Sequence, residues 1–73
     1  MIKEYGRDDK FVSIEDCKCI RATPKAILVS SPSIGADVWF PESHVHEDSE
    51  VFQDGDEGTL IVSRWIANEK GLL

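Results

Sequence analysis

Lysine and arginine are absent from the middle of this chain. Between residues 26 and 63 the sequence has eight acidic residues and no basic one, whereas the segments on either side are close to neutral. The formal net charge of −6 therefore belongs to the middle of the chain. A one-sided acidic surface repels phosphate and favours basic partners, so this region is a poor candidate for binding nucleic acid.

Cysteine and long apolar runs are also scarce. Cys17 and Cys19 are only two positions apart, where a mutual disulfide would be strained, and two cysteines do not make the framework of a secreted protein. No apolar run approaches the length of a membrane span, and residues 1–10 lack the apolar segment of a signal peptide. We therefore expect reduced cysteines, a cytoplasmic protein and no membrane contact.

The motifs of common enzymes are missing as well. The sequence has no glycine-rich loop of the kind that cradles phosphate. Ser43 and His44 are adjacent, but neighbours in sequence rarely point at each other, and no glycine-rich elbow flanks the serine. We expect a protein that is not an enzyme, with no catalytic residues and no cofactor.

The length of the chain and its apolar runs predict one small β-rich domain. Residues 1–10 are polar and are expected to form an N-terminal arm or a weak first strand, ahead of a single domain at residues 11–73. An extended segment follows from residue 11, and its apolar positions change face between Ile14 and Cys17. This change predicts a bulge or a sharp bend at residues 15–16.

The rest of the chain alternates short apolar runs with turn signals. Four consecutive apolar residues at 26–29 predict a central strand that is buried on both faces. Further signals predict a return strand at 37–40, a tight or 3₁₀ turn at 41–44, a short edge strand at 51–52, a buried strand at 59–62 and a helix at 64–70. Ser63 is a typical N-cap for that helix, and Gly71 a typical residue after its end.

These elements predict a mainly β fold with a minor α part. Four to five strands in so short a chain favour a small curled antiparallel sheet or an SH3-like or OB-like barrel, followed by a short C-terminal helix. An exposed edge strand of such a sheet could also pair across a two-fold axis, so a homodimer is an open alternative.

Six of the eight acidic residues lie between residues 47 and 57. In one interpretation their carboxylates imitate nucleic-acid phosphates and dock in a basic groove of a partner protein. In the other, the stretch is a solvated loop that keeps a small sheet soluble and blunts its edge. The candidate partner-binding residues are Trp39, His46, Glu47, Asp48, Glu50, Asp54, Asp56 and Glu57. The stretch does not match an EF-hand, because Trp65 stands where that loop needs a bidentate glutamate.

Two other kinds of site remain as alternatives. Two cysteines and two histidines, Cys17, Cys19, His44 and His46, are a legitimate ligand set for structural zinc, although one intervening residue is shorter than the usual spacing. Nucleic acid could instead bind through basic residues outside the acidic stretch, with aromatic side chains for stacking. That patch would consist of Lys18, Arg21, Lys25 and Arg64.

The order of motifs resembles a pattern in small proteins of phages and prophages. In that pattern an apolar strand precedes a Trp-[Ile/Phe]-Pro-x-Ser-x-[Ile/Val] motif, which here is Trp39 to Val45. An acidic stretch, a strand and a terminal helix containing a tryptophan then follow, as they do here up to residue 72. Phe40 and His44 depart from the commoner forms of the motif.

The proteins of this pattern are mostly of unassigned function. Small acidic phage proteins often act by binding another protein, and inhibitors of host-defence nucleases are one such class. The resemblance therefore implies a binding protein in the cytoplasm of a bacterial host, with a host-defence protein, such as a CRISPR effector, as a concrete target. The alternative is an accessory protein of replication or recombination that contacts nucleic acid.

Overall fold

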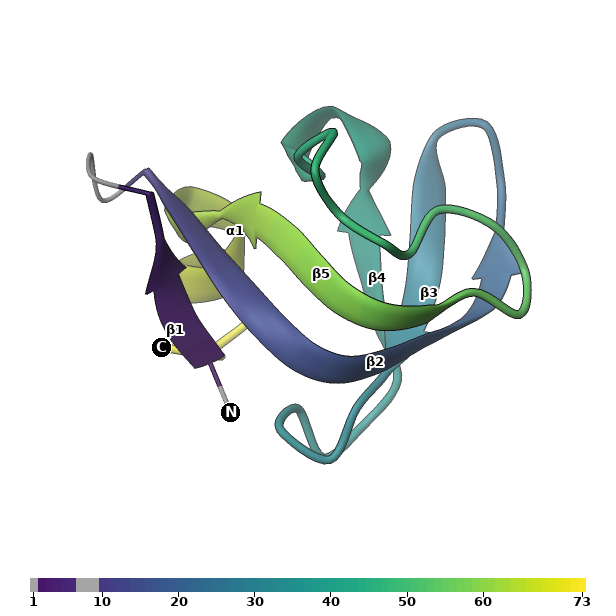
Figure 1. Cartoon of the computed structure of the whole chain (residues 1–73), viewed down its shortest axis with the longest axis horizontal. Coiled ribbons are helices and arrows are strands. Elements are labelled where there is room, and N and C mark those ends of the chain that lie inside the picture. Colours follow the sequence, from purple (N-terminus) through teal and green to yellow (C-terminus); the bar gives the residue numbers. More distant parts are fainter. Residues whose placement is uncertain (1, 7–9) are drawn as a thin grey trace.

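Antiparallel strands make up most of the regular structure of this chain. The computed structural model describes residues 2–6 and 10–73. Its elements are β1 (Ile2–Tyr5), β2 (Phe11–Ala22), β3 (Ala26–Ser30), β4 (Val38–Pro41), the 3₁₀ turn η1 (Glu42–His44), β5 (Glu57–Ser63) and α1 (Arg64–Glu69). The five strands form one curled sheet, and a short helix follows them (Figure 1). The predicted fold class is confirmed.

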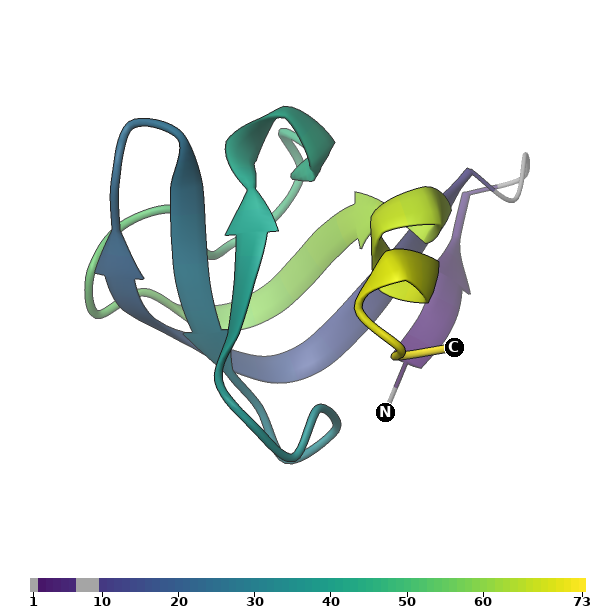
Figure 2. The same cartoon turned by 180° about the vertical axis from the view of Figure 1, so that it is seen from behind.

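The long strand β2 is the centre of the sheet. Its first half pairs with β1 on one side and β5 on the other, and its second half pairs with β3. β4 then pairs with β3. β2 and β5 run side by side across the molecule, with β3 and β4 towards one end and α1 and β1 towards the other (Figures 1 and 2). No helix in the described part of the chain is long and apolar enough to cross a membrane.

The N-terminal segment contributes a strand. Of the two alternatives for residues 1–10, the structure has a strand at Ile2–Tyr5, which pairs in register with residues 11–14 of β2. Residues 1 and 7–9 of the predicted arm lie outside the described residues.

The predicted bulge in β2 is confirmed. Its register against β5 shifts between Ile14 and Cys17, and Asp16 has a positive φ of 57°. Because of the extra residue, Cys17 and Cys19 face the same core as Ile14 rather than the opposite face. A second register shift, against β3, lies between Cys19 and Arg21 and was not predicted; it accompanies an Ile20 that is 44 % exposed.

The core lies inside the curl of the sheet. Phe40, Val29 and Leu60 contribute fully buried side chains from β4, β3 and β5. The helix adds Ile66 and Ala67 to the same cluster. Its predicted N-cap is confirmed, because the Ser63 side chain accepts a hydrogen bond from the Ile66 backbone N–H.

Two details of the predicted strands are wrong. The strand at 26–29 is central, but only Ile27 and Val29 are buried, and Leu28 on its other face is half-buried. Residues 51–52 form no strand, because the segment before them takes up the free edge of β5. Val51 is instead buried in the core, and Phe52 is 39 % exposed.

Candidate functional site

The first part of the acidic stretch lies along the outer edge of β5. Val45 forms an isolated bridge with Val62, and the backbone N–H of His46 donates to the Ile61 carbonyl at 2.7 Å. The Ser49 hydroxyl accepts a hydrogen bond from the Ile61 N–H at 2.8 Å and donates to the Ile61 carbonyl at 3.0 Å. Segment 45–50 therefore covers an edge of the sheet that would otherwise present unpaired backbone groups.

Glu50 makes the last hydrogen bonds between segment 45–50 and β5, and its partner there is Thr59. Its backbone N–H donates to the Thr59 carbonyl at 2.8 Å, and its carboxylate accepts from the Thr59 N–H at 2.9 Å. The glutamate passes so close to Gly58 that a Cβ there would lie 2.7 Å from the Glu50 carboxylate and 2.9 Å from its Cβ. Gly58 also has a φ of +144°, so only glycine fits at this position without strain.

The turn at residues 53–56 is tied to the end of β2. Cys19 donates its backbone N–H to the Asp56 carbonyl at 2.8 Å, and Gly55 donates to the Cys19 carbonyl at 2.9 Å. The Asp54 carboxylate accepts a hydrogen bond from the Ala22 N–H. Residues 54–56 thus extend the pairing of β5 with β2 as far as the β2–β3 turn.

Asp56 holds its own turn together. Its carboxylate accepts hydrogen bonds from the backbone N–H groups of Phe52 at 3.0 Å and Gln53 at 2.9 Å. Both bonds stabilise the charged carboxylate, and they therefore hold the pKa of Asp56 below its ordinary value.

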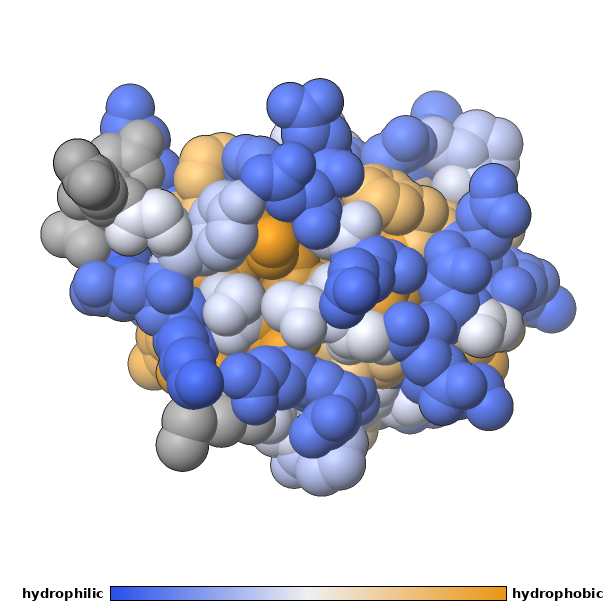
Figure 3. All heavy atoms as spheres, in the orientation of Figure 1, coloured by the Kyte–Doolittle hydropathy of each residue, from blue (hydrophilic) through white to orange (hydrophobic). Residues whose placement is uncertain are grey.

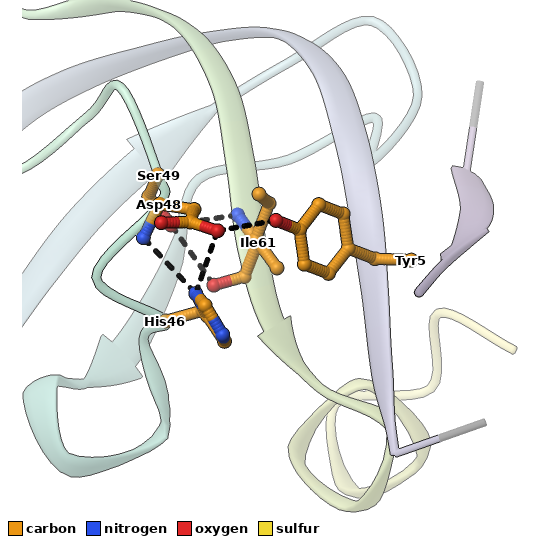
Figure 4. Close-up of polar contacts among 5 residues, drawn as sticks. All are labelled: Tyr5, His46, Asp48, Ser49 and Ile61. Carbon is orange, nitrogen blue, oxygen red and sulfur yellow. Dashed lines mark hydrogen bonds and ion pairs between the residues drawn. The ribbon is translucent and has the colours of Figure 1, made fainter. Parts of the chain in front are cut away.

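Asp48 connects the acidic stretch to β1. The Tyr5 hydroxyl donates to the Asp48 carboxylate, and this bond is the main cause of the raised pKa of Tyr5 (Figure 4). The Asp48 backbone N–H donates to Nδ1 of His46 at 3.0 Å. His46 in turn packs edge-on against Phe11, with ring centroids 4.7 Å apart. Nδ1 of His46 therefore acts as the acceptor of the backbone bond from Asp48, and it also lies 3.8 Å from the Asp48 carboxylate.

Four of the six carboxylates, those of Asp48, Glu50, Asp54 and Asp56, are thus bound to backbone N–H groups or to the Tyr5 hydroxyl. Among the described residues, none of the six forms an ion pair with lysine or arginine. Together they form the acidic surface, a band along the outer side of β5 and the 53–56 turn, made of Glu47, Asp48, Glu50, Asp54, Asp56 and Glu57. Hydrophilic side chains gather over the 53–56 turn at the right-hand side of Figure 3. The side chains of Glu47 and Glu57 are exposed and make no hydrogen bond in the described structure.

The chain matches no protein-family model, no curated protein and no solved structure in the comparisons made. The geometry of its own residues must therefore carry the functional argument.

Trp39 lies on a different part of the molecule from the 53–56 turn. It is 40 % exposed on the outer face of β4, where it pairs with Leu28 of β3, and Leu28 pairs with Arg21 of β2. Two strands therefore separate Trp39 from that turn. Among the other candidates, His46 lies next to Asp48 in the acidic surface.

The four basic residues do not form one patch, because Arg64 lies apart from the other three. Lys18 and Arg21 are exposed in the second half of β2, and Lys25 is exposed in the turn after it. Arg64 forms an ion pair with Glu4 of β1 at 3.0 Å, at the opposite end of the molecule from Arg21 in the second half of β2. Lys3 likewise pairs with Glu15 at 3.1 Å. Lys18 lies beside Glu57 of the acidic surface in the pairing of β2 with β5.

The four residues considered for zinc do not converge. Cys17 and Cys19 are buried, and their thiols contact the backbone carbonyls of Ile14 and Arg21. Burial raises the pKa of both thiols, which disfavours the thiolate that zinc requires. His44 instead contacts the Ser63 hydroxyl at 2.9 Å. In the described ranges, no three His, Cys, Asp or Glu side chains lie close enough together to hold a metal ion.

Sequence reasoning missed two residues that build this surface. Ser49 is only 7 % exposed and binds both backbone groups of Ile61, and Tyr5 anchors Asp48 from a strand 43 positions away. A serine within an acidic stretch looks like any solvated loop residue. Its role depends on the position of β5, which the local sequence does not encode.

Proposed function

We propose that this chain is a non-enzymatic protein-binding module that uses its acidic surface against a basic surface of a partner protein. The observation that carries the proposal is the way in which the carboxylates are held. Asp48, Glu50, Asp54 and Asp56 are fixed by hydrogen bonds to uncharged donors, so their side chains are ordered without being neutralised by lysine or arginine. A charged surface that is already ordered loses less conformational entropy when a partner binds.

The pairing of the other charges supports the same direction. Lysine and arginine outside the acidic stretch are in part already paired, as in the contacts of Lys3 with Glu15 and Arg64 with Glu4. In the described structure no carboxylate of the acidic surface pairs with lysine or arginine, and Asp48 has a contact of 3.8 Å with His46. Unneutralised charge of one sign steers a partner of opposite charge and speeds their association, and the steering weakens as salt rises. This contrast favours a basic protein over a nucleic acid as the partner.

The resemblance to phage and prophage proteins gives the proposed partner a class. Proteins that handle nucleic acid have basic grooves, which a band of carboxylates fits by charge. We place the partner among such proteins of a bacterial host, with defence nucleases and CRISPR effectors as examples, and the module in the host cytoplasm. An accessory protein that contacts nucleic acid directly is the alternative.

Two glutamates allow the charge to be tested without disturbing the fold. The side chains of Glu47 and Glu57 are exposed and form no hydrogen bond or ion pair in the described structure, so E47Q/E57Q removes two charges and leaves the backbone pairing of β5 in place. We expect the variant to bind a pentalysine peptide about threefold more weakly at low ionic strength, since each exposed charge pair contributes a few tenths of a kcal/mol. NMR titration measures the dissociation constant.

The matched control removes two charges elsewhere. D37N/E69Q alters exposed residues of the β3–β4 loop and of α1, outside the acidic surface. Under the proposal the control binds the peptide like the unaltered protein. Equal weakening by both variants would mean that binding follows net charge alone, and that the acidic surface has no special role.

A further inference from the structure

An open apolar pocket adjoins the acidic surface. It has a volume of about 380 Å³ and lies between the β2–β3 turn, η1 and residues 52–53. Apolar side chains of Ala22, Pro24, Ile27, Val45 and Phe52 line it, and Glu42 stands in its wall. Figure 3 shows hydrophobic surface in this region, between the top of the molecule, where η1 lies, and the hydrophilic right-hand side. The volume is at the lower end of that of small-molecule sites and suits one large side chain.

The pocket and the acidic surface are built by the same hydrogen bonds. Asp54 accepts from the N–H of Ala22 in one wall, and Asp56 accepts from the N–H of Phe52 in another. The carboxylates that give the surface its charge therefore also position the backbone that carries the apolar lining. A ligand in the pocket must lie within reach of their charge.

The charge around the pocket defines the ligand. Neither Glu42 nor Asp54 forms an ion pair with lysine or arginine in the described part of the chain. Lys25 lies beside Glu42, whose backbone N–H donates to the Lys25 carbonyl, but its side chain pairs with neither carboxylate in the described structure. The two carboxylates disfavour phosphate at this rim, and a second copy of the chain would bring a second acidic surface against the first. An apolar group with positive charge beside it fits both features.

We infer that the pocket receives one large apolar side chain of the partner, from a segment with lysine or arginine on either side of it. The inference rests on the proposed function and adds to it the chemistry of the partner's contact segment. The basic residues contact Glu42 and Asp54 at the rim, and the apolar side chain packs against Phe52 and Val45. Because Phe52 is already 39 % exposed, the pocket is open to this side chain without a change in the fold.

Three capped peptides separate the contributions of the pocket and of the charge. They have the sequences Lys-Lys-Leu-Lys-Lys, Lys-Lys-Ala-Lys-Lys and Ser-Ser-Leu-Ser-Ser, and NMR titration of the whole chain gives each dissociation constant. We expect the lysine–leucine peptide to bind about tenfold more tightly than the lysine–alanine peptide, which corresponds to burial of one apolar side chain. The amide signals of Ala22, Phe52 and Gln53 should shift most.

Each of the other outcomes contradicts a different part of the proposal. Equal affinity of the two lysine peptides overturns the pocket and leaves the proposed function standing. Equal affinity of the two leucine peptides overturns the contribution of charge, and with it the proposed function, while the pocket stands. Largest shifts at Trp39 would assign the contact to the outer face of β4 and overturn the inference. A failure of all three peptides to bind overturns both.

Matched variants test the pocket from the side of the protein. F52A removes an exposed side chain from the lining and leaves the backbone bond to Asp56 intact. We expect it to abolish the difference between the two lysine peptides. I20A removes an equally exposed apolar side chain that lies outside the pocket, and the difference should persist. Persistence of the difference in F52A would exclude this pocket as the binding site.

Discussion

At the scale of single residues, Asp56 shows how a charged side chain can be structural and still remain charged. Its carboxylate accepts two backbone N–H groups of its own turn, and no lysine or arginine in the described structure neutralises it. The carboxylates of Asp54 and Glu50 likewise accept hydrogen bonds from the backbone N–H groups of Ala22 and Thr59. The acidic residues are thus part of the framework of the fold as well as the source of its surface charge.

We expect D56N to lower the stability of the fold at neutral pH, because the amide is a weaker acceptor than the carboxylate. The bonds from Phe52 and Gln53 keep the pKa of Asp56 below its ordinary value of 3.8. Their contribution to stability is therefore complete above that value and is lost as the pH falls through the lower pKa of the folded state. Urea unfolding of both proteins at several pH values measures the difference.

The difference in unfolding midpoint between the two proteins should be constant near pH 7 and shrink in the acid range. E47Q is the matched control, because Glu47 makes no hydrogen bond in the described structure. If D56N unfolds at the same urea concentration as E47Q at pH 7, the two N–H bonds contribute nothing measurable.

The residue scale also marks a limit of prediction from sequence. The run from Asp54 to Gly58 predicts a turn because these residue types favour it, and a turn is present at residues 54–55, although Glu57 and Gly58 already belong to β5. Its anchor on Ala22 could not be predicted, because that N–H lies 32 positions earlier in the chain. Composition identifies a residue that can accept a hydrogen bond, and only the assembled sheet determines the donor.

At the scale of elements, segment 45–50 behaves as an irregular edge of the sheet. It pairs with β5 through backbone bonds at His46 and Glu50 and through the side chain of Ser49 between them. The segment joins η1, after β4, to the far side of β5, so the curled sheet has a covered edge there. One of the two interpretations of this stretch was a solvated loop that keeps the sheet soluble and blunts its edge. The covered edge agrees with the second of these two roles.

We expect S49A to destabilise the fold by about 1–3 kcal/mol, because the buried Ile61 N–H loses its only acceptor in the described structure. The Ile61 carbonyl keeps its bond from the His46 N–H, so the loss is confined to one group. Chemical denaturation measures the free energy of unfolding.

The control for this variant is S43A, which alters an exposed serine of η1 without a side-chain hydrogen bond in the described structure. It should leave the free energy of unfolding within about 0.5 kcal/mol of the original. A loss of less than this in S49A would mean that water replaces the hydroxyl and that the edge is not sealed.

The strands themselves were predictable because their apolar runs and turn residues are local signals. The return strand, the 3₁₀ turn, the strand at 59–62 and the capped helix all follow from residues within a few positions of one another. The prediction of an edge strand at 51–52 was wrong because a β-branched residue followed by an aromatic one also suits a loop whose first side chain is buried in the core, as Val51 is. Whether such a segment becomes a strand or a loop depends on whether the edge of a neighbouring strand is still free to pair with it.

At the scale of the whole molecule, basic and acidic residues differ in whether they form ion pairs. Basic residues of the flanks pair with acidic residues of β1 and β2, whereas the acidic surface along β5 forms no ion pair with lysine or arginine in the described structure. The charge count of the sequence predicted the excess and its position in the chain. It did not predict that the excess would be ordered, since order comes from the sheet that the acidic stretch covers.

Amide hydrogen exchange tests the ordering of the acidic surface most directly. The N–H groups of Ala22, Phe52, Gln53 and Thr59 donate to its carboxylates, whereas the N–H of Glu47 makes no hydrogen bond in the described structure. We predict that these four amides exchange measurably more slowly than that of Glu47 at pH 7, after correction for intrinsic rates. Exchange of all five at the same corrected rate would contradict the account, because the carboxylates would then be free in solvent and the surface would not be ordered.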